Sequence, residues 1–245
     1  MSGIISLHNV TKKFGKKVVL ADYNLDIIER EFICLTGESG SGKSTLLNLV
    51  GLLEKPTSGQ INICGYVNPK LNSHTGTNLL RNEISYLFQN YGLIENETVL
   101  YNLKLATRFL RLKKKEETQR INNILDKLHL HKVLNDKVYC LSGGEQQRVS
   151  LARIMLKPSR ILLADEPTGS LDEKNKKIVM DILSSLHAAG KTIVLVTHDL
   201  TLKEYATRTI NLQQNETSNH TVPAGPGEER DVNAVTGNNT MFNEK

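Results

Sequence analysis

A nine-residue stretch at residues 37–45, GESGSGKST, constrains this chain more than any other feature. It holds Gly37, four further residues, and then Gly42, Lys43 and Ser44, which is the spacing of a phosphate-binding loop. The glycines let the backbone curl so that successive N–H groups point at one anion, and a helix beginning near Lys43 adds its positive N-terminal end. The sequence therefore predicts a nucleotide site, with Lys43 at the β- and γ-phosphates and the Ser44 hydroxyl on Mg²⁺.

The residues on either side of the loop favour this interpretation. Residues 31–36, EFICLT, have the pattern of a buried strand, and residues 46–53, LLNLVGLL, that of an apolar helix. A plain Gly/Ser turn before a helix is the alternative. A phosphate loop is the better interpretation, because such loops connect a strand to a helix.

Length and composition limit the size of the core and the classes of function that the chain can have. With 245 residues, of which 39% are apolar, the chain can bury one sizeable core and a subdomain. The net charge of +5 comes from scattered Lys and Arg, so we expect no nucleic-acid platform; a face toward anionic lipid or a basic phosphate site fits the charge as well.

The cysteines and the apolar runs indicate where the protein works. The spacing of Cys34, Cys64 and Cys140 is not that of paired metal ligands, and it fits a cytosolic protein with reduced thiols. No run approaches the ~18 to 20 apolar residues of a membrane span, so in a membrane function another protein must cross the bilayer.

Two residues outside the loop are candidates for the same site. Residues 4–14 predict an edge strand that ends at Phe14, which is either an aromatic that stacks on adenine or an ordinary half-buried strand residue. Residues 84–88, ISYLF, predict a buried strand that is followed by Gln89. Ligands bind at the carboxyl ends of strands in open α/β sheets, so Gln89 is a candidate for completing a Mg²⁺ and water site.

The middle of the chain changes to a helical period over residues 97–137. Residues 68–77, before it, are expected to be a polar loop. The three lysines at residues 113–115 are interpreted as a solvated loop beside the two glutamates that follow. His129 and His131 have no third ligand nearby in the sequence, so no metal site is expected there.

Residues 141–148, LSGGEQQR, predict a second helix N-terminus that can bind an anion. Ser142 can cap the helix, and Gly143 and Gly144 allow the backbone to approach a ligand closely. One nucleotide hardly needs two such helix starts. The second therefore indicates a site for a nucleotide held by another copy of the chain.

Residues 161–172, ILLADEPTGSLD, predict an apolar strand that ends in two carboxylates. Asp165 is placed to hold Mg²⁺ through water, and Glu166 to orient or deprotonate an attacking water. Two acidic residues that merely open a loop are the alternative, which the phosphate loop disfavours. Another buried strand, TIVLVTH, ends at His198, at the same sheet edge as Asp165, where the imidazole can donate to a γ-phosphate.

The end of the chain has a different composition. A final strand is expected to begin at Arg208, whereas residues 213–245 are rich in Asn, Thr, Gly, Glu and Pro and carry a net charge of −3. We expect residues 213–245 to be a disordered tail.

These motifs, taken together, resemble the nucleotide-binding subunit of an ATP-binding cassette (ABC) transporter. In chain order they are GESGSGKST, Gln89, LSGGEQQR, LLADEPTGSLD and His198. The resemblance covers residues 4–212, and the LSGGE string is among the motifs most diagnostic of any family. It implies a single ABC ATPase domain over residues 1–212 with an α/β fold. That fold is a P-loop NTPase core with a mixed sheet, an N-terminal antiparallel β subdomain and an inserted α-helical subdomain. The helical subdomain, over about residues 91–157, would carry the signature and form a docking groove.

The resemblance also implies how the site works. Two copies would sandwich two ATP molecules head to tail, each between the phosphate loop of one copy and the LSGGE segment of the other. Phe14 would stack on adenine, Gln89 would couple the Mg²⁺ site to a transmembrane partner, Asp172 would contact the opposite copy, and His198 would hold the γ-phosphate. The residues implied to bind ATP are Phe14, Gly37, Glu38, Ser39, Gly40, Ser41, Gly42, Lys43, Ser44, Thr45, Ser142, Gly143, Gly144, Glu145 and Asp172; those for Mg²⁺ are Ser44, Gln89 and Asp165; those for catalysis are Glu166, His198 and Gln89.

The implied function is an ATPase that powers a separate integral membrane permease from the cytoplasmic face of the cell membrane. ADEPTGSLD and FQNYGLIENETVLYNL resemble the branch for lipoprotein release, macrolide export, and bacteriocin or antimicrobial-peptide export or resistance. Glu38, where many relatives have Pro, and the tail depart from the family pattern. An energiser of an importer is one alternative. A soluble cassette ATPase of translation or DNA repair is another, but those proteins have two fused cassettes or a long coiled-coil insertion, which this chain lacks.

Overall fold

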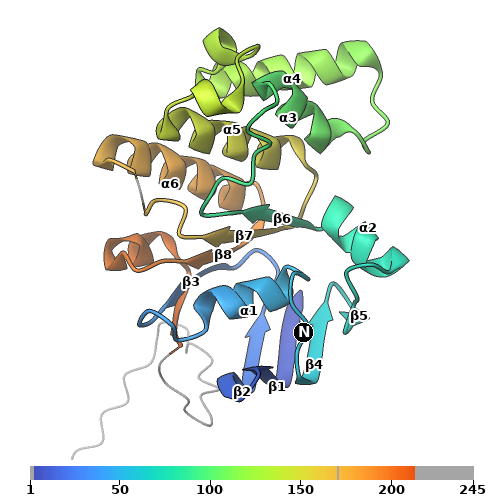
Figure 1. Cartoon of the computed structure of the whole chain (residues 1–245), viewed down its shortest axis with the longest axis vertical. Helices are drawn as coiled ribbons and strands as arrows, with labels where there is room; N and C mark the ends of the chain where they lie inside the picture. The colour runs from blue at the N-terminus through green and yellow to red at the C-terminus, as the bar shows by residue number, and fades with distance from the viewer. Residues whose placement is uncertain (1–2, 170, 213–245) are drawn as a thin grey trace, which may run out of the picture. The chain divides into compact units, whose positions relative to one another are not determined.

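The structure is a computed structural model that describes residues 3–169 and 171–212. The predicted tail at residues 213–245 lies outside the described residues. The described part contains two β-sheets with helices on both faces of the larger one (Figure 1). The predicted α/β fold class is confirmed, and the parallel and antiparallel strands lie in two separate sheets.

The larger sheet is parallel and has five strands in the order β6-β7-β8-β3-β9. Every residue of β3 and β8 is buried, because helices cover both faces of the sheet. The carboxyl ends of these strands meet at one edge, where the candidate residues are expected. The strands are β3 (Phe32–Thr36), β6 (Ile84–Leu87), β7 (Ile161–Asp165), β8 (Thr192–Val196) and β9 (Arg208–Asn211).

The smaller sheet is antiparallel, with strand order β2-β1-β4-β5. β1 pairs with β2 on one side and with β4 on the other, so the prediction of an edge strand at residues 4–14 is wrong. Alternation of apolar residues shows which face of a strand is buried but not how many strands flank it. The strands are β1 (Ile5–Phe14), β2 (Lys17–Ile27), β4 (Ser58–Ile63) and β5 (Tyr66–Val67).

The helices form layers around the parallel sheet (Figure 1). α5 and α6 pack on one face, and α3 and α4 pack with α5 in an apolar cluster of their own. None of the described helices is long and apolar enough to span a bilayer. The helices are α1 (Lys43–Val50), α2 (His74–Asn82), α3 (Val99–Thr107), α4 (Lys114–Leu128), α5 (Gly143–Leu156) and α6 (Glu173–Ala188), with 3₁₀ turns at His131–Val133, Val138–Cys140 and Leu200–Tyr205.

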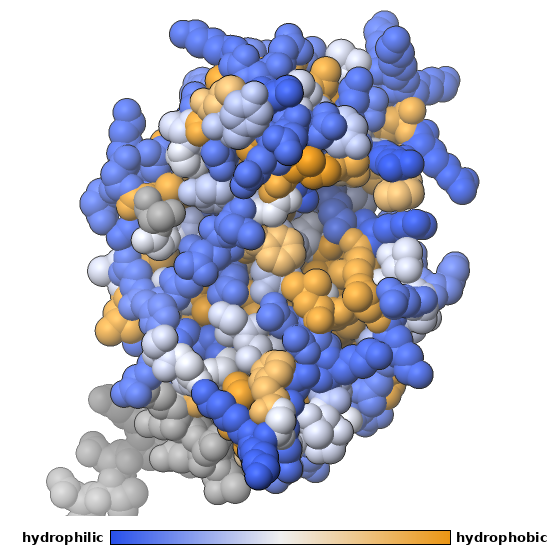
Figure 2. All heavy atoms as spheres, in the orientation of Figure 1, coloured by the Kyte–Doolittle hydropathy of each residue, from blue (hydrophilic) through white to orange (hydrophobic). Residues whose placement is uncertain are grey.

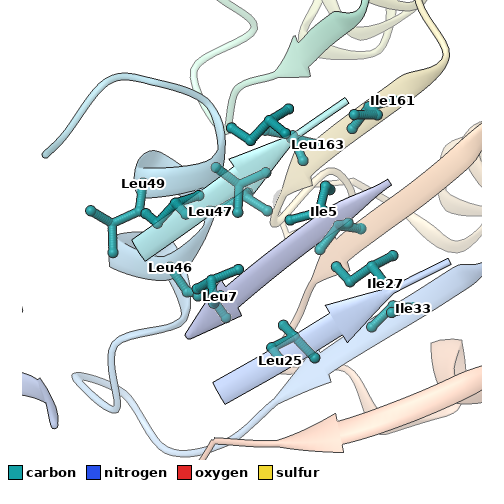
Figure 3. Packing of buried hydrophobic residues seen from close by; sticks show 14 of the residues in the cluster. Ile5, Leu7, Leu25, Ile27, Ile33, Leu46, Leu47, Leu49, Ile161 and Leu163 are labelled. Atoms are coloured by element: carbon teal, nitrogen blue, oxygen red, sulfur yellow. The ribbon is translucent and has the colours of Figure 1, made fainter. Parts of the chain in front are cut away.

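α1 fills the space between the two sheets. Its leucines Leu46, Leu47 and Leu49 are fully or almost fully buried. They belong to one cluster with Ile5 and Leu7 of β1 and with residues of the parallel sheet (Figure 3). This packing fixes the first turn of α1, and with it the phosphate loop, relative to both sheets.

Two predicted loops contain the beginning of a helix. α2 begins at His74, within the predicted loop at residues 68–77, because the Ser73 hydroxyl accepts a hydrogen bond from Gly76 N at 3.0 Å and caps the helix. α4 begins at Lys114, so two of the three lysines predicted in a loop belong to the first helical turn. Apolar periodicity does not reveal either start, since polar residues surround both.

The cysteines and histidines that the sequence singled out have ordinary surroundings. Burial raises the pKa of the Cys34 and Cys64 thiols to about 11, and Cys140 is exposed. His131 Nε2 lies 2.7 Å from Asp126 Oδ1, in an exposed pair.

Candidate nucleotide-binding site

A cleft of about 610 Å³ opens at the carboxyl edge of the parallel sheet. It collects residues from the phosphate loop, from β2 and from the segments that follow β6, β7 and β8, which are far apart in the sequence. The lining residues are Lys17, Val19, Ser39, Gly40, Gly42, Lys43, Ser44, Thr45, Gln89, Glu166, Gly169, Val196 and His198.

The phosphate loop owes its curl to glycines with a left-handed backbone. Gly40 has φ of 80° and Gly42 has φ of 101°, and a Cβ on Gly42 would come within 3.1 Å of the side chains of Val19 and Leu20. Gly42 is also the N-cap of α1, so the free N–H groups of the first helical turn face the loop. The loop and the helix start thus supply donors for one anion.

The Lys43 ammonium is held inside this curl. The residue is only 5% exposed, and Nζ donates hydrogen bonds to the carbonyl oxygens of Gly37 and Glu38, both at 2.8 Å. A buried ammonium must keep hydrogen-bond partners. Phosphate oxygens in the loop would offer it charged acceptors in place of neutral ones.

The Ser44 and Asp165 side chains are in contact, although 121 positions separate them. Ser44 Oγ donates to Asp165 Oδ1 at 3.1 Å. Burial raises the pKa of the Asp165 carboxyl, while the hydrogen bond from Ser44 and the charges of Lys43 and His198 oppose this. With Gln89 in the same cleft, the hydroxyl, carboxylate and amide oxygens form a donor set that fits Mg²⁺.

Glu166 has an unusual backbone and an unsatisfied side chain. Its φ is 45°, its N–H is fixed by a hydrogen bond to Val196 O at 2.9 Å, and its side chain is 15% exposed. Oε1 is buried without a hydrogen bond, and His198 Nε2 lies 3.4 Å from it. Strained backbone and an unsatisfied carboxylate oxygen are costly and cluster at functional sites. Glu166 also lines the cleft, and its role toward an attacking water stays a prediction.

Phe14 lies beside the cleft but is not among its lining residues. It is 46% exposed, pairs with Lys17 across the β1–β2 turn, and has Lys12 Nζ 4.6 Å from its ring centroid. The cleft wall next to it comes from Lys17 and Val19, which sequence analysis missed. The sequence does contain a signal for them: the two residues are two positions apart in the strand after the predicted turn, so their side chains lie on the same face.

The LSGGE segment lies outside this cleft in the described residues. Ser142 is the N-cap of α5: its Oγ accepts a hydrogen bond from Glu145 N at 3.4 Å, and its own N–H donates to Glu145 Oε2 at 2.9 Å. The hydrogen bonds from Ser142 lower the pKa of Glu145, so its carboxylate stays charged. Ser142 and Gly143 are exposed. The start of α5 is thus rigidly capped and accessible to another molecule.

Asp172 caps a helix of its own chain. Its carboxylate accepts hydrogen bonds from the backbone and the side-chain amide of Asn175, both at 2.8 Å, at the start of α6. Asn175 Oδ1 in turn accepts from Arg148 Nη1 of α5 at 3.2 Å. Asp172 does not line the cleft, and its contact with a second copy stays a prediction.

Gln147 connects α5 to the segment that carries Glu166. The side chain is buried, and Nε2 donates to Pro167 O at 2.9 Å. We expect Gln147→Leu to lower the free energy of unfolding by about 1–3 kcal/mol, because a buried carbonyl loses its donor. Urea unfolding measures this loss. Gln119→Leu, on the exposed face of α4, is the control and should change stability by at most about 0.5 kcal/mol; equal losses in the two variants would refute this role of Gln147.

Comparisons with known proteins agree with this arrangement. A family profile described as ABC transporter matches residues 20–169. The macrolide export ATP-binding/permease protein MacB of Campylobacter jejuni is 39% identical over 213 residues, which are 87% of this chain and 33% of that protein. MacB of Pectobacterium atrosepticum is 38% identical over 219 residues, 88% of this chain and 34% of that protein. The chain thus spans about a third of the length of these relatives.

A solved structure has the same fold. It is a dimeric post-hydrolysis state of the ATP-binding cassette MJ0796 bound to ADP and Pi, and its TM-score is 0.77 at 38% sequence identity. The match covers 84% of this chain and 93% of that one.

Proposed function

Since the chain belongs to the ABC transporter family, we propose that it is an ATPase subunit that binds ATP with Mg²⁺ between two copies and drives a separate membrane permease. The observation that carries this proposal is the cleft. A phosphate loop with its buried Lys43, a Ser44–Asp165 pair and the Glu166–His198 pair all meet at one sheet edge. These are the parts that phosphoryl transfer to water requires.

The binding step begins at the phosphate loop. The N–H groups at the start of α1 bind the phosphates, and Lys43 exchanges the carbonyls of Gly37 and Glu38 for the β- and γ-phosphate oxygens. Ser44, Asp165 and Gln89 would hold Mg²⁺, which when bound neutralises charge on the phosphates. Phe14, at the rim, stacks on the adenine ring.

Hydrolysis depends on Glu166. Its carboxylate lines the cleft, where it accepts a hydrogen bond from the attacking water and orients it toward the γ-phosphate. The His198 side chain is 53% exposed and lines the cleft, 3.4 Å from the Glu166 carboxylate, and its imidazole donates to the γ-phosphate. The strained Glu166 backbone keeps this carboxylate at the sheet edge.

The second copy completes each site. The exposed start of α5, with Ser142 and Gly143, does not line the cleft of its own chain and is free to bind the nucleotide of another. The dimer of the MJ0796 cassette supports this arrangement. ATP bound between two copies stabilises the closed dimer by linkage, and closure is the step that the permease senses.

Export is the proposed direction, with a peptide, bacteriocin, lipoprotein or drug as the transported molecule. The names of the MacB relatives combine macrolide export with a permease, and this chain matches about a third of their length. In this proposal the permease is a separate integral membrane protein, and the ATPase acts at the cytoplasmic face of the membrane.

A pull-down from native membranes tests this proposal. Tagged Glu166→Gln protein with ATP should recover an integral membrane protein with few spans and a large extracytoplasmic domain. Tagged Lys43→Ala protein, which should not bind ATP, is the matched control and should recover less. A many-span permease together with a substrate-binding protein would contradict export, and recovery of only ribosomal or DNA-bound proteins would contradict transport.

A further inference from the structure

The connection from α3 to α4 carries a dense positive charge. Residues 108–115, RFLRLKKK, contain five cationic side chains, and all five of these residues are exposed. Arg81 at the end of α2 is exposed too, and its guanidinium carbon lies 4.1 Å from the centroid of the Phe109 ring. We call residues 108–115 together with Arg81 the basic turn.

In the part of the chain that the structure describes, these cations have no acidic partners. Among residues 3–169 and 171–212, no carboxylate lies within salt-bridge distance of any of the six. Glu116 and Glu117 follow directly in the sequence. The Glu117 carboxylate accepts a hydrogen bond from the buried Thr107 hydroxyl instead of pairing with a lysine. The charge of the basic turn is therefore available to another molecule.

An exposed aromatic ring stands among these charges. Phe109 is 53% exposed, with Arg81 on its ring and the Arg108 guanidinium 5.9 Å from the ring centroid. Leu110 and Leu112 in the same connection are half-buried. The corner where α3 passes into α4 shows long hydrophilic side chains with apolar ones between them (Figures 1 and 2).

We propose that the basic turn binds the headgroups of anionic phospholipids at a membrane surface. Clusters of Lys and Arg are attracted to an anionic leaflet, and an aromatic ring beside them suits the boundary between headgroups and acyl chains. Three consecutive lysines at a helix start point in different directions, so they match a field of many headgroups better than one carboxylate of a peptide.

The same geometry disfavours single-stranded nucleic acid. Binding of such strands uses aromatic rings as platforms on which bases stack. Arg81 already covers a face of the Phe109 ring at 4.1 Å, and no second aromatic contacts this ring in the described residues. The basic turn shares no residue with the nucleotide cleft, so lipid binding is independent of the proposed transport function.

Vesicle flotation with the full chain and no permease tests the proposal. We expect the chain to float with vesicles of equal parts phosphatidylserine and phosphatidylcholine and to stay unbound with phosphatidylcholine alone. Raising NaCl from about 0.1 M to about 1 M should release it, since the Debye length falls from ~10 Å to ~3 Å. Equal binding to both vesicles, or binding that resists salt, would overturn the proposal.

The decisive variant replaces Lys113, Lys114 and Lys115 by Gln. Each cation at an anionic surface contributes about fivefold in affinity, so the triple variant should bind phosphatidylserine vesicles roughly a hundredfold more weakly. A matched control replaces three exposed lysines elsewhere, Lys127, Lys132 and Lys177, by Gln, with the same change in net charge. The control should bind like the parent.

Two further measurements separate the explanations. Phe109→Ser leaves every charge in place and should weaken vesicle binding several-fold, while ATP hydrolysis in solution stays at the parental rate in all these variants. Equal losses in the triple variant and its control would mean that net charge alone acts, and would overturn the proposal. So would a single-stranded RNA that competes the chain off the vesicles at equal phosphate concentration.

Discussion

Glu166→Gln should reduce the rate of ATP hydrolysis by about 10²–10⁴-fold and leave ATP binding intact. The amide has almost the same size, so the left-handed backbone and the contact with His198 can persist, but it cannot accept a proton from the attacking water. The substitution also removes a negative charge from the cleft where the γ-phosphate is proposed to bind. The ATP-bound dimer should therefore accumulate, which size-exclusion chromatography with ATP and with ADP detects.

The control for this experiment is Glu116→Gln, an identical change on the exposed first turn of α4. It should hydrolyse ATP at the parental rate and show no trapped dimer. If Glu166→Gln keeps near-parental turnover, Glu166 is not the base, and the unsatisfied oxygen at its side chain needs another explanation.

Lys43→Ala should lose ATP binding itself, a step before the hydrolysis that Glu166→Gln blocks. The ammonium now donates to two backbone carbonyls, and in the complex it would donate charge-assisted hydrogen bonds to phosphate oxygens. Each such bond contributes about 1.5–3 kcal/mol, so the loss of two weakens ATP binding by about 10²-fold or more. Calorimetric titration of the variant with ATP measures this loss directly.

Lys17→Ala is the matched control for Lys43, because Lys17 lines the same cleft but is exposed on β2. It should weaken ATP binding far less than Lys43→Ala. Thermal unfolding without nucleotide checks that Lys43→Ala is folded, since the two loop carbonyls lose a donor. A folded Lys43→Ala protein that titrates like the parent would contradict the phosphate site.

The two substitutions together separate binding from chemistry. Glu166→Gln should bind ATP and dimerise without turnover, whereas Lys43→Ala should do none of these. A structural defect shared by both variants would instead lower both activities and the unfolding temperature in parallel.

Features that depend on neighbours a few residues away are predictable from the residue types alone. The spacing of Gly37, Gly42 and Lys43 predicted a curled loop and a helix start, and α1 begins at Lys43. Ser142 was predicted as a helix cap, and it forms a capping box with Glu145. Such features follow from local backbone geometry and short hydrogen bonds, which the residue types fix directly.

Contacts between distant segments depend on the packing of the whole chain, which no local pattern reveals. β1 lies inside its sheet because β4, some 50 residues further on, pairs with it, a contact that alternation cannot reveal. The left-handed backbone of Glu166 and the Gln147–Pro167 hydrogen bond likewise arise from packing between elements. The basic turn, too, depends on Arg81 reaching Phe109 from another helix. Strand order and helix packing bring these groups together, and they depend on the whole core instead of on any one stretch of sequence.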